Sequence, residues 1–308
     1  MTPHSHHHHA PVHGRSAFAA ALVITLVYAF IELGGGLWSG SLALVSDAGH
    51  MFSDVFALGL AAGAAWLAQR PVGHRHSYGW ARAEVVGAFI NGLLMLGIVV
   101  WLVVEAVQRL LHQQPVQGAG VIVIASIGLV INGVVAYILG HSEETLNRRA
   151  ALVHVLGDLL SSLAAVIAGA VIYFTGWVLI DPILSLVIGM LILGTTVQLL
   201  REALHVLMEG VPHAVDFAQI GTALASVAGV SEVHDLHIWS IASHRTALSA
   251  HVEISRLDEW PGILDACRHL LRHDFGIEHV TLQPEERGTA RIPHHATVTL
   301  HPREAKKR

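Results

Sequence analysis

The sequence predicts a multi-spanning α-helical membrane protein with six transmembrane helices and a small α+β domain at its C-terminal end. Of its 308 residues, 53% are hydrophobic and only 13% are charged, whereas soluble domains carry roughly 25% charged residues. Long apolar runs fill the chain as far as Glu209, and shorter amphipathic segments follow the break between Gly210 and Pro212. This composition disfavours a soluble enzyme.

Six apolar runs are long enough to cross a bilayer as helices, which takes about 20 residues each. They cover residues 18–38, 41–67, 85–110, 120–139, 152–174 and 182–200. The first run lacks the small-residue cleavage site of a signal peptide, so we expect it to be a true span that follows a histidine-rich leader at 1–16.

The distribution of arginine predicts the orientation of these spans, because cationic loops remain on the cytoplasmic side of a membrane. The side that holds the N-terminus carries Arg15, Arg70, Arg75, Arg82, Arg148, Arg149 and Arg201. The opposite side carries Arg109 alone. Both termini are therefore expected in the cytoplasm.

The segment 209–287 has the α-β-β-α-β pattern of a small ferredoxin-like cytoplasmic domain. Helices are expected at 213–227 and 261–273, and strands at 230–241, 246–254 and 277–283. In the second strand Leu248, Ala250 and Val252 alternate with polar neighbours, which is typical of a sheet with one buried face. We expect residues 288–308 to form a disordered tail.

Two of the predicted spans carry ionisable side chains at the depth of the hydrocarbon. The second span contains Asp47, His50 and Asp54 at spacings that place them on one helical face, and the fifth contains His154 and Asp158. An ionisable group at this depth costs several kcal/mol unless it is paired or bound. Because these two spans run in opposite directions, we expect His50 near Asp158 and Asp54 near His154.

Two imidazoles and two carboxylates form a four-coordinate site that suits Zn2+ best, Co2+ or Cd2+ less well, and Ca2+ or Mg2+ poorly. A membrane site that must release its ion lies between two access paths, which indicates transport. The alternative is a set of buried hydrogen-bond partners that hold the bundle together. The HxxxD spacing occurs on two separate spans, and this repetition favours metal.

Two other functions use similar residues. An intramembrane metal-dependent hydrolase also binds an ion, but it needs an activated water and usually a glutamate base, as in HExxH, which this sequence lacks. A membrane metal sensor would bind the ion without transporting it.

Nucleic acid is not expected as a partner, because the net charge is −5. The single cysteine, Cys267, is expected to be a small buried residue.

Several motifs together resemble the cation diffusion facilitator family, and its zinc-exporting branch in particular. They are SDAGHMFSD at 46–54, YGWARAE at 78–84, HVLGD at 154–158, MEGVP at 208–212, HDLHIW at 234–239 and LSAHV at 248–252. The resemblance implies homodimers in a bacterial inner membrane that exchange a cytoplasmic divalent metal for protons.

The same resemblance assigns the transport site to the positions of His50, Asp54, His154 and Asp158. It gives Asp47 no ligand role, so we expect Asp47 to be a helix–helix contact or part of the proton path.

This chain departs from the family at two further metal sites. In the loop between spans two and three, non-ligating residues occupy two ligand positions of some bacterial members, and His74 and His76 remain. The tail domain keeps His234 and His251 but ends with Glu285. A regulatory Zn2+ site there must be rebuilt, and the further candidates are His237, His244 and His279.

Two weaker signals complete the prediction. The leader histidines, which could capture metal or be an expression tag or a solvated tail, are His4, His6, His7, His8, His9 and His13. The resemblance implies that Arg82 and Glu209 form a charge pair that links the membrane bundle to the tail domain. The alternative is that both are ordinary interfacial charges.

Overall fold

The computed structural model describes residues 12–68, 70, 73–140, 146–242 and 245–287. The C-terminal segment 288–308 and most of the histidine-rich leader lie outside this part of the chain. The described residues divide into two compact units, those within 1–60 and 90–199 and those within 61–89 and 200–308. The second unit contains the loop between the second and third helices as well as the predicted tail domain.

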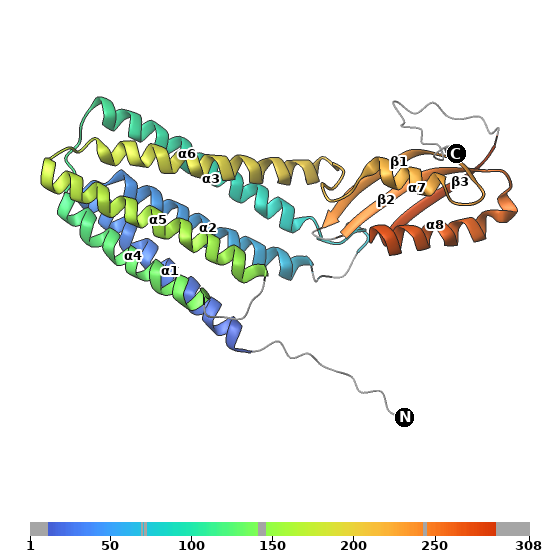
Figure 1. The fold of residues 1–308 in the computed structure, drawn as a ribbon, viewed down its shortest axis with the longest axis horizontal. Helices are drawn as coiled ribbons and strands as arrows, with labels where there is room; N and C mark the ends of the chain where they lie inside the picture. The colour runs from blue at the N-terminus through green and yellow to red at the C-terminus, as the bar shows by residue number, and fades with distance from the viewer. Residues whose placement is uncertain (1–11, 69, 71–72, 141–145, 243–244, 288–308) are drawn as a thin grey trace, which may run out of the picture. The chain divides into compact units, whose positions relative to one another are not determined.

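The six predicted spans each coincide with one long helix (Figure 1). These are α1 (Val12–Ser39), α2 (Leu42–Ala68), α3 (Ala83–Leu111), α4 (Gly118–Gly140), α5 (Leu146–Thr175) and α6 (Ile180–Leu207). Five of them, α2 to α6, are long and apolar enough to cross a membrane, and the apolar part of α1 is shorter over the described residues.

Helices α4 and α5 approach each other through small residues. A Cβ atom on Gly118 would lie 2.8 Å from the carbonyl oxygen of Gly169, and a Cβ atom on Gly169 would lie 2.9 Å from the backbone nitrogen of Ile122. Small residues allow this close approach in a membrane, where lipid is as apolar as the helices and packing drives association. Helix α5, which carries His154 and Asp158, is therefore held directly against α4.

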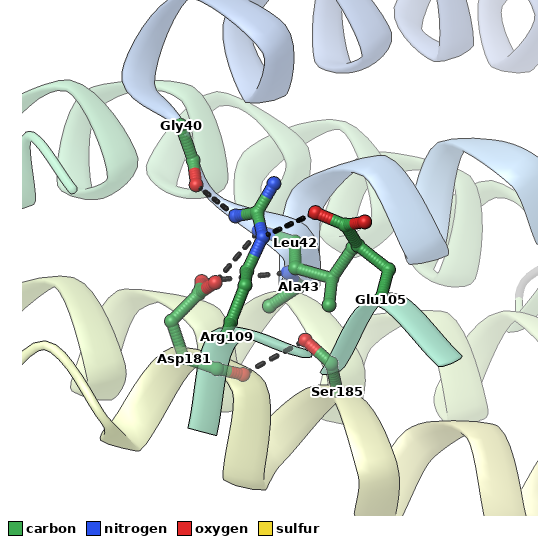
Figure 2. A network of polar contacts seen from close by, with 7 residues as sticks. All are labelled: Gly40, Leu42, Ala43, Glu105, Arg109, Asp181 and Ser185. Atoms are coloured by element: carbon green, nitrogen blue, oxygen red, sulfur yellow. Dashed lines mark hydrogen bonds and ion pairs between the residues drawn. The ribbon is translucent and has the colours of Figure 1, made fainter. Parts of the chain in front are cut away.

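A polar network fixes the N-terminal end of α2 (Figure 2). Asp181, in the first turn of α6, is fully buried and accepts hydrogen bonds from the Ser41 hydroxyl at 2.5 Å and the Leu42 backbone N–H at 2.6 Å. Arg109 of α3 forms an ion pair with Glu105 at 2.9 Å and also donates to the Gly40 carbonyl. The ends of α1, α2, α3 and α6 are thereby tied together.

The tail domain has the predicted order of helices and strands. Its elements are α7 (Phe217–Ala225), β1 (Val230–Ala242), β2 (Arg245–Ile254), the short helix η1 (Leu257–Glu259), α8 (Trp260–Phe275) and β3 (His279–Glu286). Strand β2 is central, antiparallel to β1 and parallel to β3.

One hydrophobic core joins α7 and α8 to the sheet. Leu224 of α7 and Leu271 of α8 are fully buried in it together with Leu248 and Val252 of β2. Because side chains alternate along a strand, the residues between Leu248 and Val252 that have the opposite parity, including His251, face away from both helices. One face of the sheet is thus left for polar residues.

Candidate metal centres

The second helix presents the first half of the predicted transport site. His50 and Asp54 lie one turn apart on α2, and Nε2 of His50 is 3.6 Å from Oδ2 of Asp54. Their side chains are 23% and 31% exposed without a surrounding bilayer. The HxxxD spacing therefore brings an imidazole and a carboxylate together on one helical face, as predicted from the period of the helix.

The fifth helix supplies the second half. Asp158 is buried, and one turn later the Ser161 hydroxyl donates a 2.8 Å hydrogen bond to Oδ1 of Asp47 on α2. This bond holds α2 and α5 together at the level of the predicted site. The side chain of His154 lies outside the described part of the chain. Closure of all four ligands around one ion therefore stays a prediction.

Polar contacts with neighbouring helices support both halves. Ser53 of α2 donates to the Asn91 side chain of α3 at 3.3 Å, and Asn132 of α4 donates to Ser162 of α5 at 3.2 Å. All four side chains are buried, Ser53 directly precedes Asp54, and Ser162 lies about one helical turn after Asp158. Buried polar groups need such partners, and these pairs fix the rotation of α2 and α5 about their axes.

The tail domain brings three predicted ligands together. His234, His251 and Glu285 each offer one ligand atom, and these atoms lie within 4.8 Å of one another. Nδ1 of His251 is 2.7 Å from Oε1 of Glu285, and Nε2 of His234 is 3.1 Å from Oε2 of the same carboxylate. Over the described residues, this is the group of three that could hold a metal ion. It can provide two nitrogen ligands and one oxygen ligand.

The register of the sheet explains this convergence. His234 of β1 pairs directly with His251 of β2, while Glu285 of β3 pairs with Glu253, two residues further along β2. Side chains two residues apart share a face of a sheet, so the Glu285 carboxylate reaches diagonally to His251. The group lies on the face of the sheet that α7 and α8 leave open.

Asp235 lies beside this group, although the sequence patterns did not predict it as a site residue. Asp235 has a backbone φ of 50° and lies in a register irregularity of β1 between His234 and His237. Its carboxylate is 3.1 Å from Nε2 of His237 and 3.6 Å from Nε2 of His251. Aspartate adopts the left-handed region more readily than most residues, but strand periodicity gives no sign of the irregularity.

The other tail histidines have different positions. His237 is 64% exposed and contacts the group through Asp235. His279 lies against the ring of Tyr78, with centroids 5.6 Å apart. It is six residues from Glu285 on the same strand, or about 20 Å at 3.3 Å per residue. It therefore cannot share an ion with Glu285, and His244 lies outside the described residues.

The remaining candidates form no cluster in the described residues. His74 and His76 are exposed in the loop after α2, and the ring of His76 stacks on Trp80 at 4.2 Å. His4, His6, His7, His8 and His9 lie outside the described residues, as does the side chain of His13. The leader and loop sites therefore stay predictions.

The predicted charge pair is present as a contact. Nη2 of Arg82 is 3.1 Å from Oε1 of Glu209, and the two side chains are 37% and 64% exposed. Arg82 directly precedes α3 and Glu209 follows α6, so the pair joins the ends of these two helices. Both residues belong to the same compact unit as the tail domain.

Known proteins match both parts of the chain. Residues 18–208 match the cation efflux transmembrane domain, and residues 212–287 match the cytoplasmic domain of cation efflux proteins. The solved metal-bound C-terminal domain of the CzcD transporter from Cupriavidus metallidurans is 33% identical and covers 23% of this chain and 99% of that one, with a TM-score of 0.22.

Curated relatives are similar over nearly the whole length. The cadmium, cobalt and zinc/H(+)-K(+) antiporter of Bacillus velezensis is 37% identical over 298 residues, which is 95% of this chain and 94% of that one. The zinc transporter ZitB of Escherichia coli is 36% identical over 289 residues, or 92% of each chain. With both domains matched and relatives above 30% identity along their full length, this chain belongs to the cation efflux family.

Proposed function

We propose that this protein exports Zn2+, and less selectively Cd2+ or Co2+, from the bacterial cytoplasm in exchange for protons. The observation that carries the proposal is the pair of HxxxD motifs on α2 and α5, two helices joined by the Ser161–Asp47 hydrogen bond. Full-length relatives named as zinc transporters and as a metal antiporter support it. The similarity supports neither the intramembrane hydrolase nor the sensor without flux.

The transport site is formed by His50, Asp54, His154 and Asp158. Two imidazole nitrogens and two carboxylate oxygens give the tetrahedral nitrogen and oxygen set that Zn2+ prefers, and they are too few for Ca2+. Asp47 is not a ligand in this proposal. Its carboxylate accepts from Ser161 and keeps α5 in place beside α2.

Exchange for protons follows from the chemistry of these ligands. Histidine must be neutral and aspartate ionised to bind a metal, so metal binding releases protons and protons compete for the same site. An inward proton gradient then favours release of the ion on the outer side. Movement of net charge adds about 2.3 kcal/mol per charge per 100 mV of membrane potential.

The tail domain contributes a homodimeric cytoplasmic unit with a regulatory metal site. His234, His251 and Glu285 are the ligands that we propose, because they converge on the open face of the sheet. The excess of arginine on one side supports a cytoplasmic position for both termini. There the tail site would sample the metal that is to be exported.

Zinc flux into reconstituted vesicles tests the transport site. Asp54→Ala should abolish flux, whereas Phe56→Ala, on the outward side of the same helix and 44% exposed, should retain it. Flux in the unmodified protein should rise with a proton gradient of opposite direction. Undiminished flux in Asp54→Ala at equal protein level would remove this residue from the site, and indifference to the gradient would indicate a passive channel.

A further inference from the structure

Helix α8 carries two histidines that the proposed function does not use. Ile263, Cys267 and Leu271 are its buried residues and pack against the sheet, whereas His269 and His273 are exposed. Each histidine follows a core residue by two positions, or about 200° around a helix of 3.6 residues per turn. The two imidazoles therefore lie on the surface of α8 that is turned away from the core.

The two rings are side by side on this surface. Their centroids are 5.5 Å apart and their planes differ by 7°. Histidines at i and i+4 on one helical face are the arrangement by which a helix offers two nitrogen ligands to one Zn2+. The rings have this arrangement before any ion is bound, so little rearrangement is needed for binding.

A carboxylate holds the second ring. Nδ1 of His273 is 3.0 Å from Oδ1 of Asp274. Histidines that bind metals almost always donate their other ring N–H to a carboxylate, a carbonyl or a water, which orients the ring and makes it more basic. With the proton on Nδ1, the lone pair of Nε2 is available to a cation.

We propose that His269 and His273 form a second metal site on the tail domain, which binds a divalent transition ion such as Zn2+ or Cu2+ through two imidazoles, with water in the remaining positions. It is separate from the group of His234, His251 and Glu285, which lies on the open face of the sheet, across the core from α8.

The charges around the pair predict how it compares with that group. Arg268 and Arg272 flank the histidines in sequence, and Nε of Arg272 is 3.6 Å from Oε1 of Glu278. Nearby cations disfavour a bound cation, and over the described residues no carboxylate completes a compact group of three ligands with these two rings, as Glu285 does in the other group. The α8 site should thus be the weaker one and fill at higher metal concentration. Its open coordination positions allow rapid exchange of the ion.

Copper chelated by iminodiacetate is a suitable probe, because the chelator leaves positions for two imidazoles. The full-length protein is used in detergent, with His4, His6, His7, His8, His9 and His13 replaced by serine in every sample so that the leader does not bind the probe. Electron paramagnetic resonance then counts the copper ions per chain that have two imidazole ligands.

The test variant combines His273→Asp with Asp274→His and so exchanges two neighbouring residues. This keeps the composition and moves the second imidazole from i+4 to i+5, about 100° around the helix. We expect the exchange to remove one copper with two imidazoles per chain. Asp274→Asn, which keeps both histidines, should weaken binding about tenfold, the lower end of the effect of such outer partners.

An equal number of copper ions with two imidazoles in the exchange variant would overturn the proposal, and the histidines would then be solvated residues near the helix C-terminus. Calorimetric titration with Zn2+ should also show one weakly bound zinc ion fewer per chain in the exchange variant. An unchanged number of weakly bound zinc ions would count against the site. Zinc flux in vesicles should be unchanged at low zinc. Failure here therefore leaves the proposed transport site untouched.

Discussion

The single cysteine gives a direct measure of how tightly α8 is held on the sheet. Cys267 is fully buried, and burial raises the pKa of its thiol to about 11. The thiolate is the reactive form of cysteine, so at pH 8 the folded protein should react with iodoacetamide far more slowly than the unfolded protein. Mass spectrometry of the labelled chain measures both rates. Equal rates would mean that α8 does not protect the Cys267 thiol in the folded protein.

A second residue, Glu285, decides whether the tail group binds metal. Its two oxygens contact His251 and His234 at 2.7 and 3.1 Å. Glu285→Gln removes the one anionic ligand, and we expect zinc binding by the tail to weaken at least about tenfold, which is about 1.4 kcal/mol. Calorimetry on the full-length protein measures this, and Glu278→Gln, an exposed acid before β3, is the matched control. Equal affinity in the Glu285 and Glu278 variants would exclude the carboxylate as a ligand.

At the scale of elements, Asp181 acts on α2 from another helix. It is fully buried and accepts from the Ser41 hydroxyl and from the backbone N–H groups of Leu42 and Ala43, which the helix itself leaves unpaired. Asp181→Ala leaves these donors without an acceptor, and each lost hydrogen bond to a charged group costs about 1.5–3 kcal/mol.

We therefore expect Asp181→Ala to lower the thermal stability in detergent and to reduce zinc flux, because the start of α2 lies only two turns before His50. Asp181→Asn keeps one acceptor oxygen and should be intermediate. Ser185→Ala is the control, since that hydroxyl donates to the backbone carbonyl of Asp181 within α6 and not to α2 in the described contacts. Wild-type stability in Asp181→Ala would show that Arg109 and its partners hold the helix ends without it.

The elements themselves could be predicted better than their contacts. The six long helices follow from apolar runs that only a helix can place in lipid. Helix α7 is shorter than the predicted 213–227, because Asp216 caps it and accepts from the backbone N–H of Gln219 at 3.0 Å. The irregularity at Asp235 and the parallel pairing of β3 could not be read from periodicity. They decide that Glu285 joins the metal group and that His279 does not.

At the scale of the whole molecule, the spacing of the HxxxD motifs predicts two ligands on each of two helices, but not how far apart the helices lie. That depends on the packing of α4 and α5 through Gly118 and Gly169 and on the bond between Ser161 and Asp47. The transport site is thus specified partly by residues that bind no metal. Small residues and buried hydroxyl groups in apolar runs are the signal for such support, although their partners cannot be deduced from one sequence.

The ion pair of Arg82 and Glu209 joins the loop before α3 to the end of α6, where the chain leaves the membrane helices for the tail domain. At 37% and 64% exposure both groups remain accessible to water, so the pair contributes only about 0–1 kcal/mol to stability. Its effect should therefore be on transport more than on unfolding. Glu209 also has a backbone φ of 59°, which fixes the direction of the chain just after α6.

Arg82→Glu should lower zinc flux, because two carboxylates would then face each other at this junction, while the melting temperature changes little. Arg82→Glu combined with Glu209→Arg restores opposite charges in the reverse order and should recover part of the flux. The control is Arg70→Glu, which makes the same change of charge in the loop after α2. The Arg70 guanidinium lies 4.5 Å from the ring centroid of Trp66, and Glu209 pairs with Arg82 instead. A double-mutant cycle on flux at equal protein level measures the coupling. If the effects of Arg82→Glu alone and Glu209→Arg alone simply add, the two residues are ordinary interfacial charges. The connection between α6 and the tail domain then depends on the backbone at Glu209 and Gly210 instead.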